Sequence, residues 1–448
     1  MDNIDNKWHP IFEGKEAEEV LEVVDEIAKA LHQPPAAWIP WEKVAVEPYR
    51  IARGASLAHG SSGIALFYSY LSRLPIADPL FIGEAHRFIS HACDALEDAP
   101  MDNSLYRGFS GIAWVVQHLQ GFLYEDESCD PETDPNINID RLLLDHWSKQ
   151  EKFDLWGGCV GLGVYALERY PHPNSKILLE LLADQLDRLA TRSDKGITWF
   201  TPTKTMSQRV QLIYPYGFYA LGIAHGTAGV ISFLSRVYAL GILPDITEKL
   251  LDGAVSWLLT QQWENDSGLL FPQFLLPPGN KPLITGTFGW CHGDLGLAAA
   301  LASAAGCASE SSWKIKAIEV AHASIDYLDG LLRTTTFPDT TLCHGTAGLG
   351  HLFNRLYQAT GVDRFKEEAC KWFRRTLDIR KPGSGIAGFS KYSMNEDGEP
   401  AEQYDPGFIQ GAAGIGLAFL GAATDIEPTW DRAMLISAPE RIADRSLS

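Results

Sequence analysis

The chain has 448 residues, of which 46% are hydrophobic and 21% are charged, the balance of an ordinary soluble globular protein. Its formal net charge of −20 argues against binding to nucleic acids or anionic membranes, because both need clustered lysine and arginine. The same charge would suit a cationic partner such as a basic peptide, although solubility alone explains it equally well.

The N-terminus is polar and acidic, so the sequence predicts no signal peptide. It also predicts no transmembrane segment, because even the apolar stretch over residues 229–243 is interrupted by serines and by Arg236. The seven cysteines are an odd number in a chain without an export signal. That usage favours reduced thiols and a cytoplasmic protein.

One pattern returns seven times along the chain. A helical segment with one polar face is followed by a loop, and then by a Gly-x-x-Gly turn that opens an apolar helical run. Consecutive turns begin 48, 50, 68, 67, 52 and 66 residues apart, which is typical of an architecture built from one repeated unit. The turns are Gly60–Gly63, Gly108–Gly111, Gly158–Gly161, Gly226–Gly229, Gly293–Gly296, Gly345–Gly348 and Gly411–Gly414.

The segments before the turns are predicted as amphipathic helices, because apolar residues recur on one face with charged residues opposite. In the first segment Val20, Val24 and Ile27 follow this spacing. In chain order the seven segments cover residues 18–32, 79–99, 140–150, 175–193, 244–262, 311–333 and 363–379.

The runs after the turns are predicted as a second set of helices, which are apolar on more than one side. The run that follows Gly296 is built from leucine and alanine and is apolar all round, as expected of a buried helix. Each repeat therefore pairs an outer helix with an inner one, which makes this an all-α fold. Seven pairs in an open solenoid would leave both end repeats exposed. We therefore expect a closed ring, although the pattern also fits a superhelix.

The three longest spacings contain extra segments, which precede the fourth, fifth and seventh turns. Proline, glycine and asparagine in these segments predict short strands and loops. The first, over approximately residues 194–216, is predicted as a small β-rich insertion with strands at Ile197–Phe200 and Val210–Ile213. The other two cover residues 268–287 and 383–407. We place all three at the mouth of the barrel and expect residues 1–448 to form a single domain.

The fifth and sixth turns carry the groups best suited to chemistry. Cys343 and His344 directly precede Gly345, where the backbone is not yet helical and neighbouring side chains can share a metal. Cys291 holds the matching position one repeat earlier, and equivalent turns of a closed ring converge on one rim. Two thiolates and one imidazole favour zinc, and three protein ligands leave a fourth position open, as in catalytic zinc sites.

The alternative is that these cysteines are small apolar core residues, which is the usual fate of a lone buried cysteine. Two cysteines at equivalent positions, each followed by a histidine, favour the metal instead. The other cysteines lack partners at suitable spacing and are expected to be inert: Cys93, Cys129, Cys159, Cys307 and Cys370.

Further polar residues lie beside other turns. His225 holds the same place before the fourth turn, and Asp154 lies just before the third. Both are candidate proton donors and acceptors, although Asp154 alone would fit a helix cap or a loop hydrogen bond. We interpret His59, before the first turn, as a structural echo of the motif. His292 is a weaker candidate for contact with a substrate.

The motifs over residues 290–293, 342–348 and 224–229, together with the preceding Asp154, resemble those of the lanthionine synthetase C family, the LanC-type cyclases. The repeats that carry the resemblance extend over residues 57–420, which is nearly the whole chain. A free-standing chain of this length resembles the class I cyclases more than the cyclase domains of larger synthetases.

The resemblance implies an α/α toroid of seven helix pairs with one zinc ion on Cys291, Cys343 and His344. It also implies that His225 and Asp154 are the acid–base pair. Members form lanthionine and methyllanthionine rings by Michael-type addition of peptide cysteine thiolates to dehydroalanine or dehydrobutyrine. The implied substrate is a dehydrated ribosomal precursor peptide, and a dehydratase and an export transporter are the implied partners in a complex.

Three points stay open at the level of sequence. The pattern does not decide which of His225 and Asp154 gives a proton and which takes it. His292 follows Cys291 where some class I members have tyrosine, so its role is undefined. Other functions also fit: a LanC-like glutathione-binding or thiol-transferring protein, a zinc thiol-alkyltransferase of the prenyltransferase kind, or a non-catalytic helical scaffold for a cationic peptide.

Overall fold

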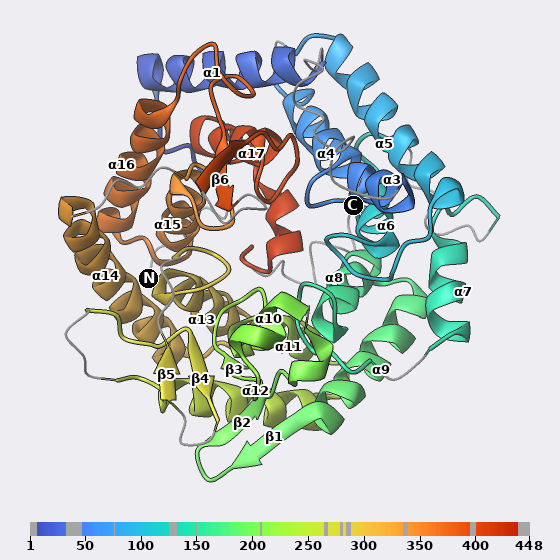
Figure 1. Cartoon of the computed structure of the whole chain (residues 1–448), viewed down its shortest axis with the longest axis vertical. Coiled ribbons are helices and arrows are strands. Elements are labelled where there is room, and N and C mark those ends of the chain that lie inside the picture. Colours follow the sequence, from blue (N-terminus) through green and yellow to red (C-terminus); the bar gives the residue numbers. More distant parts are fainter. Residues whose placement is uncertain are drawn as a thin grey trace.

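Two concentric rings of helices surround a common axis in the computed structural model (Figure 1). The structure describes residues 7–32, 47–75, 77–124, 132–147, 150–206, 208–263, 268–277, 281–283, 288–334, 339–394 and 400–437. Within these ranges, no helix is long and apolar enough to cross a membrane.

The inner ring consists of helices that each begin one residue after the first glycine of a predicted turn. A Cβ on the second glycine of any of the seven turns would lie 1.8–2.7 Å from the carbonyl oxygen six residues earlier. Only glycine therefore lets each loop fold back onto the start of its helix. The inner helices are α4 (Ser61–Leu71), α6 (Phe109–His118), α8 (Cys159–Arg169), α11 (Thr227–Ala239), α13 (Asp294–Ala308), α15 (Thr346–Thr360) and α17 (Ala412–Ala423).

The outer ring is amphipathic, as predicted. In its first helix, Val20, Val24 and Ile27 are buried, while the glutamates of the opposite face are largely exposed. The largest difference from the expected bounds is in the third outer helix, which ends at Asp145 rather than at residue 150. The outer helices are α1 (Gly14–His32), α5 (Leu80–Asp98), α7 (Ile137–Asp145), α9 (Pro173–Leu189), α12 (Pro244–Leu259), α14 (Ser311–Thr334) and α16 (Asp363–Ile379).

The inner ring is closed, which confirms the expected toroid. Each inner helix contacts the next one along the chain, and α17 returns to contact α4. Most inner helices pack against the outer helix that follows them, and α1 covers the last inner helix, α17. Residues of α17 are buried on every side, because the outer ring covers them on one side and the packed axis on the other.

Backbone hydrogen bonds join the loops at the end of the barrel where the inner helices begin. The amide of Ala58 donates to the carbonyl of Tyr106 (3.0 Å), and the amide of Ile409 donates to that of Ala58 (3.0 Å). The amide of Cys343 then donates to the carbonyl of Ile409 (3.1 Å). All four residues lie two positions before the first glycine of their turns, so equivalent loops converge on one rim.

The C-terminal segment fills the axis of the inner ring, a feature that the repeat pattern did not predict. It contains the 3-10 helix η3 (Thr429–Met434), and the red chain after α17 lies inside the ring (Figure 1). The indole of Trp290 donates to the carbonyl of Met434 (2.9 Å), and the hydroxyl of Tyr106 donates to that of Ala433 (2.7 Å). This plug therefore supports the loops of the rim from within.

Five of the seven short strands that the structure describes lie in the extra segments, whereas the first and the third strand in chain order lie just before and just after the first segment. β1 (Ala190–Ser193) pairs with β2 (Gly196–Trp199), and β6 (Lys391–Met394) pairs with β7 (Pro400–Gln403), both antiparallel. The central strand of a three-stranded sheet is β4 (Phe274–Leu276), flanked by β3 (Tyr219–Ala220) and β5 (Lys281–Leu283). In this sheet Leu275 is opposite Tyr219 on one side and Pro282 on the other.

The first insertion is less β-rich than predicted. Ile197–Trp199 lies in β2 as expected, but the predicted strand at Val210–Ile213 belongs to α10 (Gln208–Ile213), after the 3-10 turn η2 (Thr203–Thr205). A short apolar run does not distinguish a strand from a helix by its periodicity. Here Val210 packs against a small aromatic cluster, whereas Leu212 and Ile213 stay 85% and 60% exposed.

A further helix, α3 (Glu47–Ala55), leads into the first turn.

Candidate metal centre and acid–base pair

Cys291, Cys343 and His344 lie together at the rim, as the spacing of the turns predicted. Their candidate ligand atoms, two Sγ atoms and one ring nitrogen, all lie within 4.8 Å of one another. Both cysteines are buried, and the amides of Trp290 and Cys291 both approach the carbonyl of Cys343, at 3.0 and 3.4 Å. These contacts bring the fifth and sixth turns together and place the two thiols side by side.

The pKa values of the two thiols are shifted in opposite directions. A hydrogen bond from Cys343 lowers the pKa of Cys291 well below its usual value, and the same bond raises the pKa of Cys343 well above it. This hydrogen bond thus favours the thiolate at Cys291, and the thiolate is the form in which cysteine binds metals.

Asp339 orients His344, and the sequence patterns did not single it out. Oδ2 of Asp339 lies 3.1 Å from Nε2 of His344, while Nδ1 of the same ring is buried without a hydrogen-bond partner. A ring held by a carboxylate through one nitrogen, with the other nitrogen free, is the usual arrangement of a metal-binding histidine. The donor set therefore fits a thiophilic ion such as zinc.

A weak signal for Asp339 did exist in the sequence. Aspartates occur six residues before the first glycine of three turns, at Asp102, Asp339 and Asp405. Each accepts a hydrogen bond from the amide two residues later, at 2.9, 2.7 and 2.9 Å, and so opens its loop with a tight turn. The spacing marks a loop residue, but only the folded loop brings one of the three, Asp339, next to the candidate metal ligand His344.

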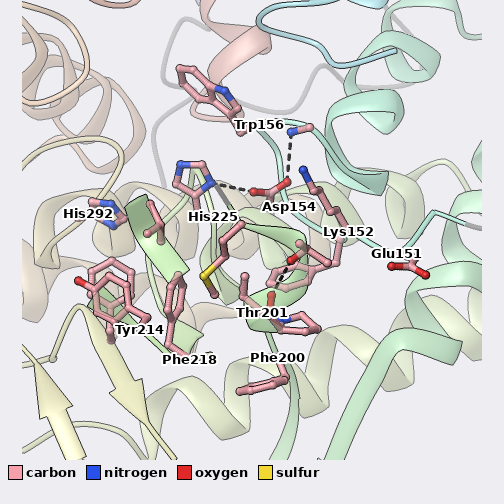
Figure 2. A pocket seen from close by; sticks show the side chains of 17 residues that line it. Glu151, Lys152, Asp154, Trp156, Phe200, Thr201, Tyr214, Phe218, His225 and His292 are labelled. Carbon is pink, nitrogen blue, oxygen red and sulfur yellow. Dashed lines mark hydrogen bonds and ion pairs between the residues drawn. The ribbon is translucent and has the colours of Figure 1, made fainter. Parts of the chain in front are cut away.

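His225 and Asp154 form a hydrogen-bonded pair beside this centre (Figure 2). Nδ1 of His225 lies 2.7 Å from Oδ2 of Asp154, and Oδ1 of Asp154 accepts a hydrogen bond from the amide of Gly157 at 3.1 Å. Asp154 thus makes a hydrogen bond within its own loop, as the sequence also suggested, and in addition orients the ring of His225. The His225 side chain remains 39% exposed, so its other edge is accessible to a substrate.

The carboxylate of Asp154 also sets the charge of His225. Burial alone would lower the pKa of His225, but the hydrogen bond and the negative charge of Asp154, with a smaller effect of Cys291, outweigh that effect. The pKa of His225 therefore lies above its usual value, and the imidazolium form persists to higher pH.

Two more rim residues surround the pair. The ring of His292 lies 6.1 Å from that of His225 and 5.0 Å from that of Phe274, between centroids, and its Nδ1 is buried without a partner. The ring of Trp156 lies 5.8 Å from that of His225, and the guanidinium of Arg107 lies 5.3 Å above Trp156. Arg107 directly precedes the second turn, and the sequence patterns did not single it out.

His59 lies apart from this cluster. Its Nδ1 is 2.8 Å from Oδ2 of Asp405, and Nζ of Lys391 is 2.9 Å from the same oxygen. Burial lowers the pKa of His59, and its side chain is only 4% exposed. The pair ties the first loop to the seventh and so contributes to the closure of the ring, in keeping with its interpretation as a structural echo.

In the part of the chain that the structure describes, one further group of carboxylates and a histidine could hold a metal, but internal contacts account for it. Asp134 and Asp140 approach His172, but Nη2 of Arg169 lies 2.6 Å from each carboxylate and supplies the counter-charge. Among the described residues, the remaining cysteines are free thiols at separate places in the fold. Cys129 lies outside the described residues.

A family model for lanthionine synthetase C-like proteins matches residues 52–435. The chain belongs to this family. Its relatives include the nisin biosynthesis protein NisC of Lactococcus lactis subsp. lactis, which is 23% identical over 360 residues, or 75% of this chain and 78% of the relative. Among solved structures, nisin cyclase superposes with a TM-score of 0.68 at 17% identity, covering 95% of this chain and 98% of the other.

Membership of the lanthionine synthetase C-like family agrees with the architecture. The likeness to nisin cyclase shows the fold, an α/α toroid. The buried free Nδ1 of His344 and the adjacent thiols are the features of this chain that fit a resident zinc ion.

Proposed function

We propose that this protein is a zinc-dependent lanthionine synthetase. It adds peptide cysteine thiolates to dehydroalanine or dehydrobutyrine in a ribosomal precursor peptide and so closes lanthionine or methyllanthionine rings. The observation that carries the proposal is the convergence of two thiols, a carboxylate-held imidazole and a separate His–Asp pair on one rim. Membership of the lanthionine synthetase C-like family supports it.

Cys291, Cys343 and His344 would hold the zinc ion, with Asp339 fixing the ring of His344. When bound, zinc supplies the Lewis acidity that deprotonates an incoming thiol, whose pKa is otherwise about 8.5. Three protein ligands leave one position for that thiol. The two protein thiols lie too deep to serve as substrates themselves, because each is less than a tenth exposed.

His225 completes the reaction by giving a proton. Addition forms a bond between sulfur and the β-carbon and places negative charge on the α-carbon and its carbonyl oxygen. The imidazolium of His225, oriented through Nδ1 by Asp154, can deliver a proton from its accessible edge to the α-carbon. The proton released by the substrate thiol returns the imidazole to its charged form, so the atoms of the peptide are rearranged without loss or gain.

Thiol alkylation tests this proposal directly. A dehydrated peptide that contains one cysteine is incubated with the enzyme and zinc and then treated with an alkylating reagent. We expect the cyclised product to keep its mass and to resist alkylation, because its thiol has become a thioether. A peptide cysteine that stays fully alkylatable would contradict the proposal, and glutathione supplied as the only thiol tests the thiol-transferring alternative.

A dehydratase and an export transporter are the partners that this function implies. The dehydratase would supply the unsaturated residues, and the transporter would take the finished product. Dehydration must come first, because serine and threonine have no electrophilic β-carbon until water is lost.

A further inference from the structure

A cavity of about 330 Å³ opens beside the His225–Asp154 pair (Figure 2). His225, Asp154 and His292 line one side, and residues of the first insertion line the other. Its volume falls at the lower end of the roughly 300–1,000 Å³ of small-molecule sites. The proposed mechanism assigns no role to the apolar residues that line this cavity.

The wall opposite the acid–base pair is aromatic. The rings of Phe218 and Phe274 lie 4.8 Å apart, and that of Tyr214 lies 5.0 and 5.7 Å from them, between centroids. Val210 and Met206 pack against this group, which forms an apolar cluster separate from the main core of the barrel. The cluster thus combines residues of the first insertion with Phe218, directly after it, and with Phe274 of the second extra segment.

The aromatic wall continues to the reacting centre. Phe274 lies 5.0 Å from His292, which lies 6.1 Å from His225, between ring centroids. Charged side chains also line the cavity (Figure 2): Lys152 and Asp154 on the side of His225, and Glu151, which pairs with Lys204 at 2.9 Å. A ligand that reaches His225 therefore has an apolar surface on one side and charged groups on the other.

The neighbours of a dehydro residue fall within reach of this wall. An extended peptide advances about 3.3 Å per residue and points successive side chains to opposite sides. With an α-carbon at His225, a side chain one or two residues away comes next to the aromatic cluster. The cavity has room for one large side chain, and not for a folded partner.

We propose that this cavity is a subsite for an aromatic or large aliphatic side chain of the substrate peptide, within two residues of the dehydro residue. The subsite selects which dehydro residue is brought to His225. This inference rests on the proposed cyclase function and adds a sequence preference to it. Burial of such a side chain corresponds to an advantage on the order of 10- to 100-fold in kcat/KM over alanine.

Three peptides test the subsite. Each contains one dehydroalanine and one cysteine, and they differ only in the residue beside the dehydroalanine, which is phenylalanine, leucine or alanine. Cyclisation is followed by loss of alkylatable thiol. We expect wild-type enzyme to prefer phenylalanine and leucine over alanine, mainly through KM. Equal kcat/KM for all three, and for three peptides with the same substitutions two residues from the dehydroalanine, would overturn the subsite but not the cyclase function. No cyclisation of any peptide would overturn the cyclase function.

Two variants and a matched control locate the preference. Val210→Trp fills the cavity and Tyr214→Ala opens its wall, so both should reduce the ratio of kcat/KM for phenylalanine over alanine toward one. Leu212→Trp adds the same bulk on the same helix at a residue that is 85% exposed and outside the cavity, and should keep the wild-type ratio. A ratio unchanged in both cavity variants, or equal losses on all three peptides, would show that the proposal is wrong.

Discussion

At the scale of single residues, the site is built from histidines held by carboxylates. Asp154 lies 2.7 Å from one ring nitrogen of His225, and Asp339 lies 3.1 Å from one ring nitrogen of His344. The two pairs differ in what the other nitrogen faces, which is a cavity for His225 and two thiols for His344. In the proposed mechanism, the same arrangement serves a proton donor in one loop and a metal ligand in another.

Replacing Asp154 with asparagine should change the pH profile of the reaction. The charge of Asp154 raises the pKa of His225, so its loss lowers that pKa. If protonated His225 is the acid, activity declines as pH rises through this pKa, and the decline moves to lower pH in Asp154→Asn. The measurement is kcat against pH for both proteins. A basic limb at the same pH in both would show that Asp154 does not act through His225.

Replacing Asp339 with asparagine should weaken the metal site. The substitution keeps an oxygen for the amide of Thr341 but removes the charge beside His344, and loss of such a partner costs about 10- to 100-fold in metal affinity. Zinc affinity is measured by competition with a chromophoric chelator. Asp405→Asn is the matched control, because Asp405 opens an equivalent loop but holds His59 instead. Equal affinities in both variants would contradict this role of Asp339.

At the scale of elements, the Gly-x-x-Gly turns position the site. The helical spacing and these glycines predicted both sets of helices, because each inner helix needs a glycine where its loop folds back. The same reasoning brought Cys291, Cys343 and His344 together. It did not find Asp339, because that carboxylate meets His344 only through the fold of the loop. It also assigned residues 210–213 to a strand, because four apolar-rich residues fit either structure.

Adding one methyl group at the sixth turn should displace the loop that carries Cys343 and His344. A Cβ on Gly348 would lie 2.1 Å from the carbonyl oxygen of Leu342, next to Cys343. We expect Gly348→Ala to lower both zinc affinity and the denaturant midpoint, because the loop must shift.

Gly83→Ala is the control for that substitution. Gly83 lies in α5, and a Cβ there would meet nothing within 4 Å, so alanine should leave stability unchanged or raise it by about 0.5–1 kcal/mol. If Gly348→Ala were as stable and bound zinc as tightly as Gly83→Ala, the turn would not control the metal loop.

At the scale of the whole molecule, the ring is closed by contact of α17 with α4, and the C-terminal plug fills its axis. The candidate site therefore lies at one end of the barrel, where the inner helices begin. The repeat pattern predicted the ring, because seven helix pairs need partners at both ends. It could not predict the plug, because residues after the last repeat carry no repeat pattern. Their partners, such as Trp290 and Arg355, are far away in the sequence.

A buried ion pair holds the plug in place. Nε of Arg355 lies 2.6 Å from Oδ2 of Asp431, and the same oxygen lies 2.7 Å from Nε2 of His351. Asp431→Ala would leave Arg355 buried without this partner, and should destabilise the protein by about 3–5 kcal/mol. Glu427→Ala removes only the half-exposed partner of Arg355, at 3.4 Å, and should cost at most about 1 kcal/mol. Urea unfolding measures both, and similar values would show that the pair does not anchor the plug.

The most direct test of the central claim is cyclisation as a function of bound zinc. The protein is stripped with a chelator, zinc is returned in steps, and the loss of alkylatable thiol from a dehydrated cysteine peptide is measured at each step. We predict that activity rises with zinc and reaches its plateau at one ion per chain, and that Cys291→Ala and Cys343→Ala remain folded but inactive. Full cyclisation by the stripped protein, or by a folded variant that holds no zinc, would contradict the claim.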